Sequence, residues 1–278
     1  MTFADELSGF SFRRVGAMVL RYSLLLRSSW PRLLDLIYWP VIQMLTWGFL
    51  QTYIARQAAG AAAAPRLQVA TGTLIGAMLL WDMMFRAQLG FSVSFLEEMW
   101  SRNMGNLLMT PLRPLEFVAA LMTMSAVRLA IGVVPVSLLA IWFFGFNLWG
   151  LGLALGAFFV VLALTSWSIG LVVSGLILRN GVGAENLAWS VLFILLPLCC
   201  VYYPVSALPA WLQHVAWALP PTYVFEGMRS ALINHVFRSD LMLAALGMDG
   251  VLFAASVAIY LRLEESARRA GALLQMGE

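Results

Sequence analysis

The chain has 278 residues, of which 62% are hydrophobic and 11% are charged, whereas soluble domains carry about 25% charged residues. All 17 basic residues are arginine, which excludes a P-loop lysine and a lysine Schiff base from this sequence. The net charge of +3, with no basic stripe among aromatic residues, argues against nucleic-acid binding. We expect an all-α polytopic membrane protein, with residues 1–278 forming one transmembrane domain.

Residues 10–32 form the first segment with a clear pattern, because apolar side chains recur in it at helical spacing. The apolar positions are Val15, Met18, Val19, Tyr22, Leu25 and Leu26. Arg14 and Arg21 lie seven residues apart on another face. The pattern predicts an interfacial helix that lies in the plane of the membrane surface, with its arginines among anionic headgroups. An ordinary solvated terminus is the alternative.

Six apolar segments reach the roughly 20 residues that a helix needs to cross a bilayer core of about 30 Å. They are predicted at residues 34–55, 69–93, 117–145, 148–178, 186–205 and 241–261. With both termini cytoplasmic, eleven arginines fall inside and four outside, which agrees with the positive-inside rule. The inner set is Arg13, Arg14, Arg21, Arg27, Arg32, Arg102, Arg113, Arg179, Arg262, Arg268 and Arg269, and the outer set is Arg56, Arg66, Arg229 and Arg238.

The connection between the second and third predicted spans reads EEMWSRNMGNLLMTPLRPLEF. We expect a short helix over residues 98–112, whose apolar side is formed by Met99, Trp100, Met104, Leu107 and Leu108. Pro111 and Pro114 end this helix in a turn. Such a helix would lie across the cytoplasmic membrane surface with its tip available to a soluble partner.

Residues 206–236 precede the last predicted span and are too hydrophobic for a solvated loop. Pro204 precedes this region, and prolines at positions 209, 220 and 221 divide it into pieces. We expect two short amphipathic helices that re-enter the outer half of the membrane, the second of them carrying Tyr223, Glu226 and Arg229. Irregular backbone at that depth is tolerated only where protein or a water-filled cavity surrounds it, so a vestibule is expected nearby.

Four charged residues lie in the interior of the predicted spans, where charge is costly and marks either function or a buried pair. Asp82 and Arg86 are four residues apart in the order that favours a helical ion pair. Arg128 lies at a matching depth in the third span, so these three residues are predicted to form one buried cluster. The cluster either locks two helices together or contacts substrate. Asp249 either lines a path or contacts a second subunit, and its small neighbours alternatively permit close helix packing.

Aromatic residues are concentrated in the first and fifth predicted spans. Those near the span ends fit an interfacial belt. Tyr38, Trp47, Trp189 and Phe193 are the candidates for lining a translocation path. Packing against lipid or within the bundle is the alternative interpretation of these four side chains.

The chain resembles the permease subunits of ABC-2 type transporters, which export polysaccharides, lipid-linked glycans, nodulation factors and drugs. The resemblance rests on the N-terminal interfacial segment, the six spans, the connection EEMWSRNMGNLLMTPLRPLEF and the segment ALPAWLQHVAWALPPTYVFEGMRSAL. In that family the connection is a coupling helix that docks on a partner ATPase, and TPLRP matches its small-polar-proline turn. The later segment is similar to the family's re-entrant helix pair, with the recurring pattern at Pro221, Tyr223 and Arg229.

The resemblance implies a role for each of these regions. Docking to the ATPase would use Arg102, Asn103, Asn106, Leu107, Thr110 and Pro111. It further implies a homodimer in the bacterial inner membrane that binds a cytosolic ABC ATPase. The partner would use ATP and magnesium, and this chain would bind no cofactor or metal. Asp82, Arg86, Arg128 and Asp249 match no motif of the family.

Two other function classes remain open from the sequence. An ion-coupled secondary transporter would use Asp82, Arg86, Arg128 and Asp249 as a relay. A membrane enzyme acting on a lipid-linked substrate would depend on His214. The chain has only two histidines, which nearly excludes a metal site built from several of them. The substrate itself is not determined by the sequence.

Overall fold

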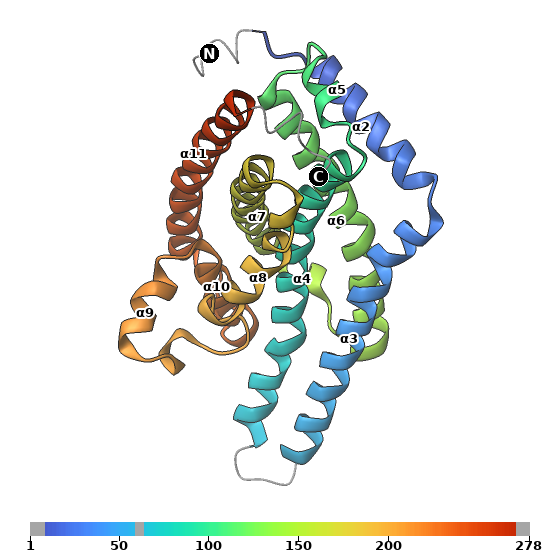
Figure 1. The fold of residues 1–278 in the computed structure, drawn as a ribbon. Helices are drawn as coiled ribbons and strands as arrows, with labels where there is room; N and C mark the ends of the chain where they lie inside the picture. The colour runs from blue at the N-terminus through green and yellow to red at the C-terminus, as the bar shows by residue number, and fades with distance from the viewer. Residues whose placement is uncertain (1–8, 59–63, 271–278) are drawn as a thin grey trace.

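A computed structural model describes residues 9–58 and 64–270 of the chain. This part consists of helices joined by short connections, without a strand (Figure 1). The helices are α2 Phe12–Arg27, α3 Trp30–Ala58, α4 Ala64–Trp100, α5 Met104–Leu108, α6 Pro114–Phe144, α7 Leu153–Asn180, α8 Leu187–Leu198, α9 Ala210–Trp217, α10 Pro220–Ile233 and α11 Ser239–Arg269, with three short 3-10 turns at Leu148–Leu151, Val182–Ala184 and Val205–Ala207. The all-α prediction is therefore confirmed.

Each predicted span coincides with a helix, but the helices differ in how well they suit a bilayer. Within the described residues, α3, α6, α7 and α11 are long and apolar enough to cross a membrane. Helix α4 has 37 residues but carries Asp82 and Arg86 near its middle. Helix α8 has only 12 residues. The count of six crossings therefore stays a prediction. The predicted topology assigns Arg66 to the outer side, and the side chain of Arg66 lies outside the described part of the chain.

The fifth predicted span is shorter than expected, because the helix ends at Leu198 rather than near residue 205. Pro197 removes a backbone donor in the last turn. Cys200 then adopts a positive φ of 54°, which an α-helix cannot accommodate. The residues from Cys199 to Pro204 are consequently an irregular connection, and α9 and α10 pack close to it.

Helix α7 is the centre of the bundle and lies between α11 and α4 (Figure 1). About 67% of its most apolar stretch is buried, compared with 17% for α3 at the edge. Hydroxyl groups help to join the central helices. The Ser166 hydroxyl of α7 donates to the Met84 carbonyl of α4 at 2.8 Å, and Ser125 of α6 donates to Ala87 of α4 at 2.5 Å. Such small hydroxyl residues allow helices to approach closely in lipid.

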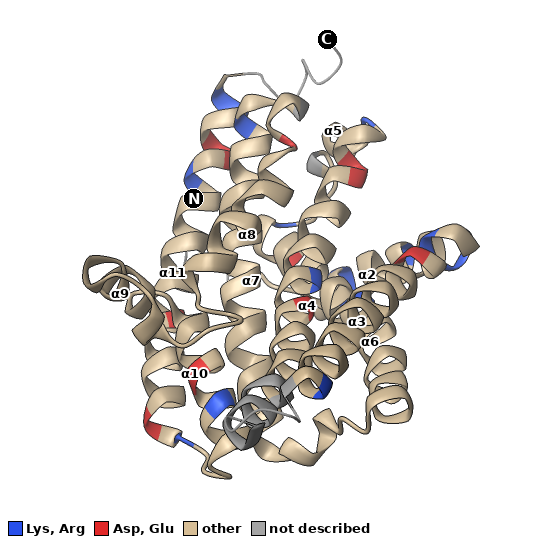
Figure 2. Ribbon diagram, turned by 90° about the horizontal axis from the view of Figure 1, so that it is seen from below, with Lys and Arg blue, Asp and Glu red and all other residues tan. Residues whose placement is uncertain are grey.

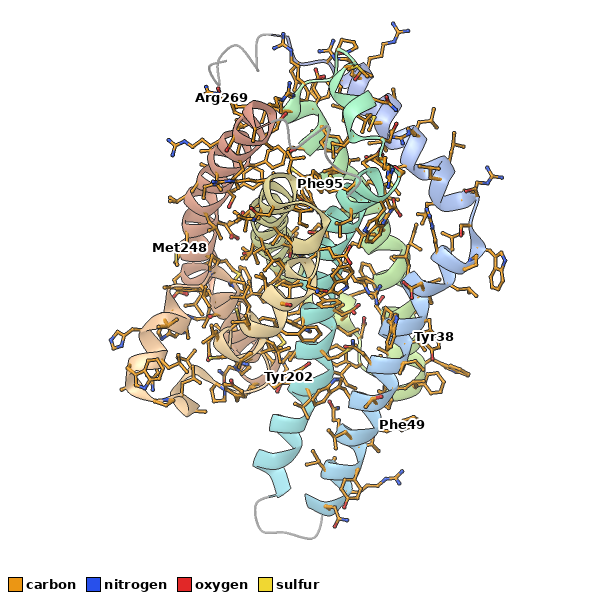
Figure 3. All side chains as sticks on the ribbon, in the orientation of Figure 1. Tyr38, Phe49, Phe95, Tyr202, Met248 and Arg269 are labelled. Carbon is orange, nitrogen blue, oxygen red and sulfur yellow. The ribbon has the colours of Figure 1, made fainter. Side chains whose placement is uncertain are left out.

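The outer faces of the bundle are apolar, as expected for helices that contact lipid. Tyr38 and Phe49 project outward from α3, and each is 58% exposed, whereas Phe95 lies between helices (Figure 3). Most of the ribbon carries no charge, and charged residues gather near the helix ends and where α2 and α4 meet (Figure 2). The first residues of α2, helix α5 and the last turns of α11 lie at one end of the bundle, called here the α5 end (Figure 1).

Candidate functional site

The connection between α4 and α6 spans residues 101–113 and projects at the α5 end (Figure 1). Its helix is shorter than the predicted 98–112, because α4 continues to Trp100 and α5 covers only Met104–Leu108. Arg102 separates the two helices with a φ of 54°, a left-handed conformation that stops α4. After α5 the chain turns through Thr110, whose hydroxyl donates to the Leu107 carbonyl at 2.6 Å.

The six predicted docking residues do not all face the same way. Four of them are exposed on the connection, namely Arg102, Asn106, Thr110 and Pro111. Asn103 is half-buried, and its amide donates to the Glu98 carboxylate at 2.8 Å. Leu107 is also half-buried and turns toward the helices below α5. The available tip is therefore smaller than predicted, and two of its residues hold it in place.

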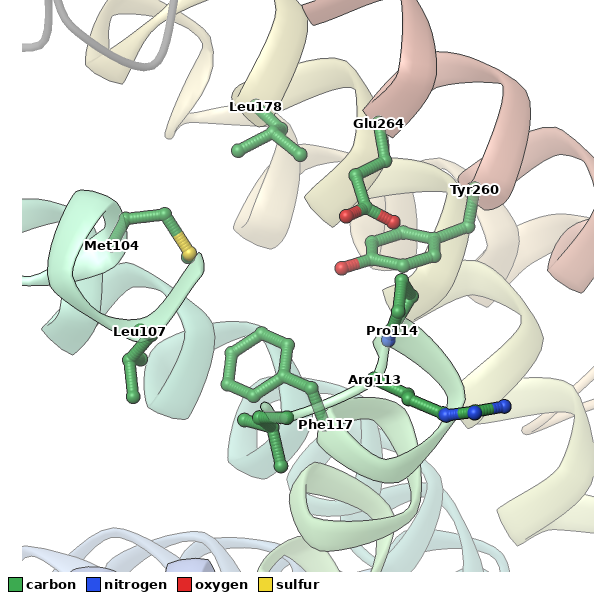
Figure 4. A pocket seen from close by; sticks show the side chains of 9 residues that line it. Met104, Leu107, Arg113, Pro114, Phe117, Leu178, Tyr260 and Glu264 are labelled. Atoms are coloured by element: carbon green, nitrogen blue, oxygen red, sulfur yellow. The ribbon is translucent and has the colours of Figure 1, made fainter. Parts of the chain in front are cut away.

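A small cleft beneath α5 shows what its apolar side rests on (Figure 4). Met104 and Leu107 of α5 face Phe117 of α6, Leu178 of α7 and Tyr260 of α11. The cleft has a volume of only about 20 Å³, close to the space of a single water molecule. Because four helices meet around it, a force applied to α5 would reach three of the long helices directly.

Helix α2 is bonded to both ends of this connection through buried carboxylates. Glu98, in the last turn of α4, accepts hydrogen bonds from the Arg21 guanidinium at 2.6 and 3.1 Å. Glu116, in the first turn of α6, accepts one from Arg14 Nε at 2.7 Å and another from the Ser11 backbone N–H at 2.7 Å. Glu98 and Glu116 are almost completely buried. The set Ser11, Arg14, Arg21, Glu98 and Glu116 is called here the α2 clamp.

The α2 clamp corrects the expectation that Arg14 and Arg21 lie among lipid headgroups. Both guanidinium groups bond to carboxylates of the bundle, although about a third of each side chain is exposed. The hydrogen bond to Glu116 raises the pKa of Arg14, and the bond to Glu98 raises the pKa of Arg21. Both arginines therefore remain charged at any physiological pH, and the clamp does not depend on pH through them.

Sequence reasoning missed Glu98 and Glu116, although each left a signal. Glu97 and Glu98 end a long helix, where carboxylates are disfavoured by the helix dipole unless cations compensate them. Glu116 stands third in a helix that begins with Pro114, and it accepts the Arg113 backbone N–H at 3.0 Å in a capping-box arrangement. Neither pattern identifies Arg14 or Arg21 as the partner, because those residues lie about 100 and 77 positions away.

The predicted ion pair of Asp82 and Arg86 is confirmed, but the prediction that Arg128 joins them in one cluster is wrong. Arg86 bonds to Asp82 at 2.7 Å and also donates to the Leu36 carbonyl of α3 at 2.9 Å. Arg128 instead bonds to Glu97 at 3.0 Å. An arginine side chain is long enough to bond to a carboxylate one helical turn or more away along the membrane normal. Comparing only the depths of the backbone positions therefore does not identify the partner.

Two features explain why these charges lie between helices. Gly132 of α6 provides the space for Arg86, since a Cβ atom there would lie 2.9 Å from the Leu36 carbonyl oxygen and 3.2 Å from Arg86 Cδ. Glu97 also pairs with Arg32 of α3 at 3.5 Å. The Asp82–Arg86 pair therefore joins α4 to α3 beside α6, and Glu97 joins α4 to both α3 and α6. These contacts support the helix-locking interpretation of these residues over a relay.

Asp249 lies apart from these pairs, between α11 and α7. Its carboxyl group is completely buried, and Oδ1 accepts a hydrogen bond from the Thr165 hydroxyl at 2.7 Å. Among the described residues, Oδ2 has no hydrogen-bond partner. Asp249 therefore pins the two helices that share the most extensive packing in the bundle.

The region of residues 206–236 forms two helices, α9 and α10, as expected, although their depth in a membrane is untested. Pro221 is buried in the first turn of α10, and the Tyr223 hydroxyl donates to the Trp217 carbonyl at 3.0 Å. Arg229 donates to the Cys200 and Val201 carbonyls at 3.0 and 3.3 Å. Helix α10 thus supplies hydrogen bonds to the irregular backbone that follows α8.

Glu226 completes this arrangement from the preceding turn of α10. Its Oε1 accepts the Val205 backbone N–H at 2.8 Å and an Arg229 N–H at 3.1 Å. Beside these residues a hollow of about 800 Å³ opens between the connection after α8, helices α9 and α10, Thr73 of α4 and the start of α11. Glu226 and Arg229 are therefore structural residues of the wall of this hollow.

The four aromatic candidates for a path lining do not surround a common cavity. The Trp47 ring stacks on Tyr202 with 4.6 Å between ring centroids. Phe193 is 61% exposed and meets Phe85 at 5.8 Å. Trp189 packs against the apolar core near the α5 end, and Tyr38 projects outward from α3. None of these four residues lines the hollow, whose aromatic lining residues are Tyr202 and Trp217.

Comparison with known proteins identifies the family. The model of the ABC-2 type transporter membrane domain matches residues 21–233, which is more than three quarters of the chain. No curated protein matches the chain significantly. The matched region runs from α2 to the end of α10 and includes the connection with α5. The chain therefore belongs to the ABC-2 type transporter family, as a membrane-embedded permease component rather than a nucleotide-binding domain.

Proposed function

We propose that the chain is the permease subunit of an ATP-driven exporter, and that a separate ABC ATPase docks on the connection at the α5 end. The observation that carries this proposal is the α2 clamp, in which buried carboxylates at both ends of residues 101–113 are bonded to helix α2. A force-receiving connection must be rigid relative to the helices that it moves. The exposed residues Arg102, Asn106, Thr110 and Pro111 form the docking tip.

In this proposal two copies of the chain form a homodimer in a bacterial inner membrane and bind two ATPase subunits. ATP and magnesium bind to the partner, and this chain supplies the path for an amphipathic, glycan or lipid-linked substrate. Closure of the ATPase pair moves α5, and the motion passes through the clamp and the cleft beneath α5 to α2, α6, α7 and α11. Hydrolysis resets the arrangement.

The proposal keeps six crossings, with both termini cytoplasmic and the α5 end inside. Helix α8 alone would extend only about 18 Å at 1.5 Å per residue, less than a bilayer core of about 30 Å. The irregular residues after α8 would complete the crossing. Such backbone requires partners within the protein at that depth, and Arg229 and Glu226 supply them.

Affinity purification from the native host tests the proposal directly. The tagged full chain, purified in mild detergent, is expected to carry one P-loop ATPase per permease copy, as measured by quantitative mass spectrometry. Scrambling residues 102–111 is expected to remove the ATPase while the permease still inserts. A chain that purifies alone and transports in vesicles without ATP would overturn the proposal.

An ion-coupled secondary transporter is the second candidate, and one observation favours it. Asp249 is completely buried and its Oδ2 lacks a hydrogen-bond partner among the described residues, as expected of a group that exchanges protons or ions. Against this candidate, Asp82, Arg86 and Arg128 are held in closed ion pairs. Transport driven by a pH gradient without ATP would favour it.

A further inference from the structure

Asp35 places a negative charge on an outer surface that is otherwise apolar. It lies in the second turn of α3, a helix that is long and apolar enough to cross a membrane. Between Arg32 and Arg56 it is the only charged residue of the sequence. Its side chain is exposed, and so are those of Tyr38 and Trp39, which lie one turn further on the same side of the helix.

The carboxylate of Asp35 has no hydrogen-bond or ion-pair partner within the part of the chain that the structure describes. Arg32 lies three positions earlier on the same helix, but its guanidinium turns toward Glu97 of α4 at 3.5 Å. A carboxylate at the edge of the hydrocarbon is costly unless a cation or hydrogen-bond donors compensate it. The described residues of one chain therefore leave this requirement unmet.

Two arginines near Asp35 have capacity to bind an anion. Arg27 ends α2, is exposed and forms no ion pair with any described residue. The side chain of Arg32 is 51% exposed, and its 3.5 Å separation from Glu97 is longer than a hydrogen bond. Glu97 is bonded to Arg128 at 3.0 Å. Because a guanidinium carries five N–H donors, Arg32 can keep its contact with Glu97 and still donate outward.

The bend between α2 and α3, called here the elbow, places these charges at the membrane surface. Only Ser28 and Ser29 separate the two helices, which meet at the outer edge of the molecule (Figure 1). Trp30 begins α3 and is 70% exposed, as is typical of tryptophan at the level of lipid headgroups. Asp35 follows about 7.5 Å further along the helix at 1.5 Å per residue. Its carboxylate is therefore within reach of a headgroup.

A phosphoethanolamine headgroup matches this arrangement of charges. Its phosphate is an anion of the kind that arginine binds well, and its ammonium group donates hydrogen bonds to carboxylates. Arg32 and Asp35 are three positions apart, so their Cβ atoms are about 5–6 Å from each other, a spacing that so short a headgroup can bridge. A purely anionic headgroup would be repelled by Asp35. A choline headgroup is cationic but has no N–H to donate.

We propose that the elbow binds one phosphatidylethanolamine molecule, with its phosphate at Arg27 and Arg32 and its ammonium group at Asp35. The acyl chains would lie along the exposed rings of Tyr38 and Trp39. The inference concerns a lipid of the surrounding leaflet rather than the transported molecule, and it does not depend on a partner ATPase. A second copy of the chain that offers an arginine to Asp35 is the competing occupant.

Native mass spectrometry of the full chain in mild detergent, titrated with dioleoyl lipids, tests the proposal. The probes are phosphatidylethanolamine, its N-methyl and N,N-dimethyl derivatives, and phosphatidylcholine, which form a series that loses one N–H donor at each step. The Kd for the first bound lipid is expected to rise along this series, by about fivefold between its ends, as for one exposed ion pair.

Two variants separate the roles of the charges. Asp35→Asn is expected to abolish the difference between phosphatidylethanolamine and phosphatidylcholine, since it removes the charge that the ammonium group recognises. Arg27→Gln is expected to raise the Kd of all four lipids by about threefold and to keep their ratio, because they share the phosphate. Asp240→Asn is the matched control, since Asp240 is an exposed aspartate at the opposite end of the bundle from α5, and its ratio should stay normal.

Equal Kd values for phosphatidylethanolamine and phosphatidylcholine in the unaltered chain would overturn the proposal, and so would an unchanged ratio in Asp35→Asn. The same spectra count the permease chains. Loss of a permease pair in Asp35→Asn, with the lipid ratio unchanged, would identify a second copy as the occupant. The assay contains no ATPase and no ATP, so its failure leaves the proposed function intact, and loss of ATPase copurification leaves the lipid site intact.

Discussion

At the residue scale, buried carboxylates are the most informative feature of this permease. Glu98 and Glu116 are almost inaccessible. Glu98 accepts hydrogen bonds from the side chains of Arg21 and Asn103, and Glu116 accepts them from Arg14 and from two backbone N–H groups. A buried carboxylate is costly unless it is paired and hydrogen-bonded, so each depends on its arginine. The arginines depend less on the acids, because they are partly exposed. The acids are therefore the sensitive members of the α2 clamp.

Glu98→Gln is expected to destabilise the protein by about 1 kcal/mol, since it removes a charge-assisted bond to a partly exposed arginine. The Tm in detergent should fall by roughly 2–4 °C for a chain of this size. Glu265→Gln is the matched control, because Glu265 pairs with Arg269 at an exposed position. Equal Tm values for Glu98→Gln and the control would show that the clamp does not stabilise the fold.

Asp249→Asn separates the two candidate functions. The asparagine oxygen can still accept the Thr165 hydroxyl, so the contact between α7 and α11 is expected to survive. Under the proposed function, ATP-dependent transport in proteoliposomes should stay within about twofold of normal, because no proton leaves this group. A relay mechanism instead requires complete loss of coupling in this variant, with expression and Tm unchanged.

At the element scale, α5 is held between a clamp and a cleft although it has only five residues. So short a helix is not stable by itself. Its orientation comes from Asn103, which bonds to Glu98, and from Met104 and Leu107, which rest on α6, α7 and α11. The connection after α7 contacts the end of α4 that precedes α5, because the Trp100 indole donates to Glu185 at 2.9 Å.

Leu107→Pro is expected to uncouple transport from ATP hydrolysis. Proline removes the N–H that bonds to the Asn103 carbonyl at 3.0 Å, and it cannot keep α5 in its present form. ATP-dependent transport should fall at least tenfold while membrane insertion remains normal. Leu107→Met is the control, since it keeps the N–H and an apolar side chain. Normal transport by a stably expressed Leu107→Pro protein would remove α5 from the mechanism.

At the scale of the whole molecule, burial is strongly asymmetric. Helix α7 is largely buried within one chain, whereas α3 exposes Trp39, Phe49 and Tyr53 along its length. In a membrane such a surface faces either lipid or a second copy. The charge distribution fits one orientation in a bilayer, with most arginines near the α5 end or on α2.

Native mass spectrometry of the complex released from nanodiscs is expected to show two permease chains of 30.7 kDa with two ATPase subunits. The expectation follows from the proposed homodimer, in which two docking tips each receive one ATPase. Disrupting the tip by Arg102→Glu should leave the permease pair intact and remove the ATPase mass. A single permease chain bound to one ATPase would contradict the homodimer.

The sequence by itself determined that this is an all-helical membrane protein. The length and apolar composition of each segment are local properties, and they can be read one segment at a time. The sequence located the helices, the break at TPLRP and the two short helices before α11, since proline and apolar runs act on their immediate neighbours. It also carried the motifs by which the family was recognised. The predicted bounds differ from the observed helices at several ends, for example 69–93 against Ala64–Trp100 and 241–261 against Ser239–Arg269. At 98–112 and 186–205 the helices are shorter than predicted, because positive φ angles at Arg102 and Cys200 interrupt the chain.

Apart from pairs within one helix, such as Asp82–Arg86 in α4, tertiary structure decided which charges meet. The depth estimated from the sequence placed Arg128 beside Asp82 and Arg86, but in the packed structure Arg128 bonds to Glu97. Packing likewise pairs Arg14 and Arg21 with carboxylates that are far away along the chain. It also created the hollow, whose wall combines five segments. The physical reason is the range of the interactions: helix formation depends on neighbouring residues, whereas ion pairs and cavities depend on how the helices pack against one another.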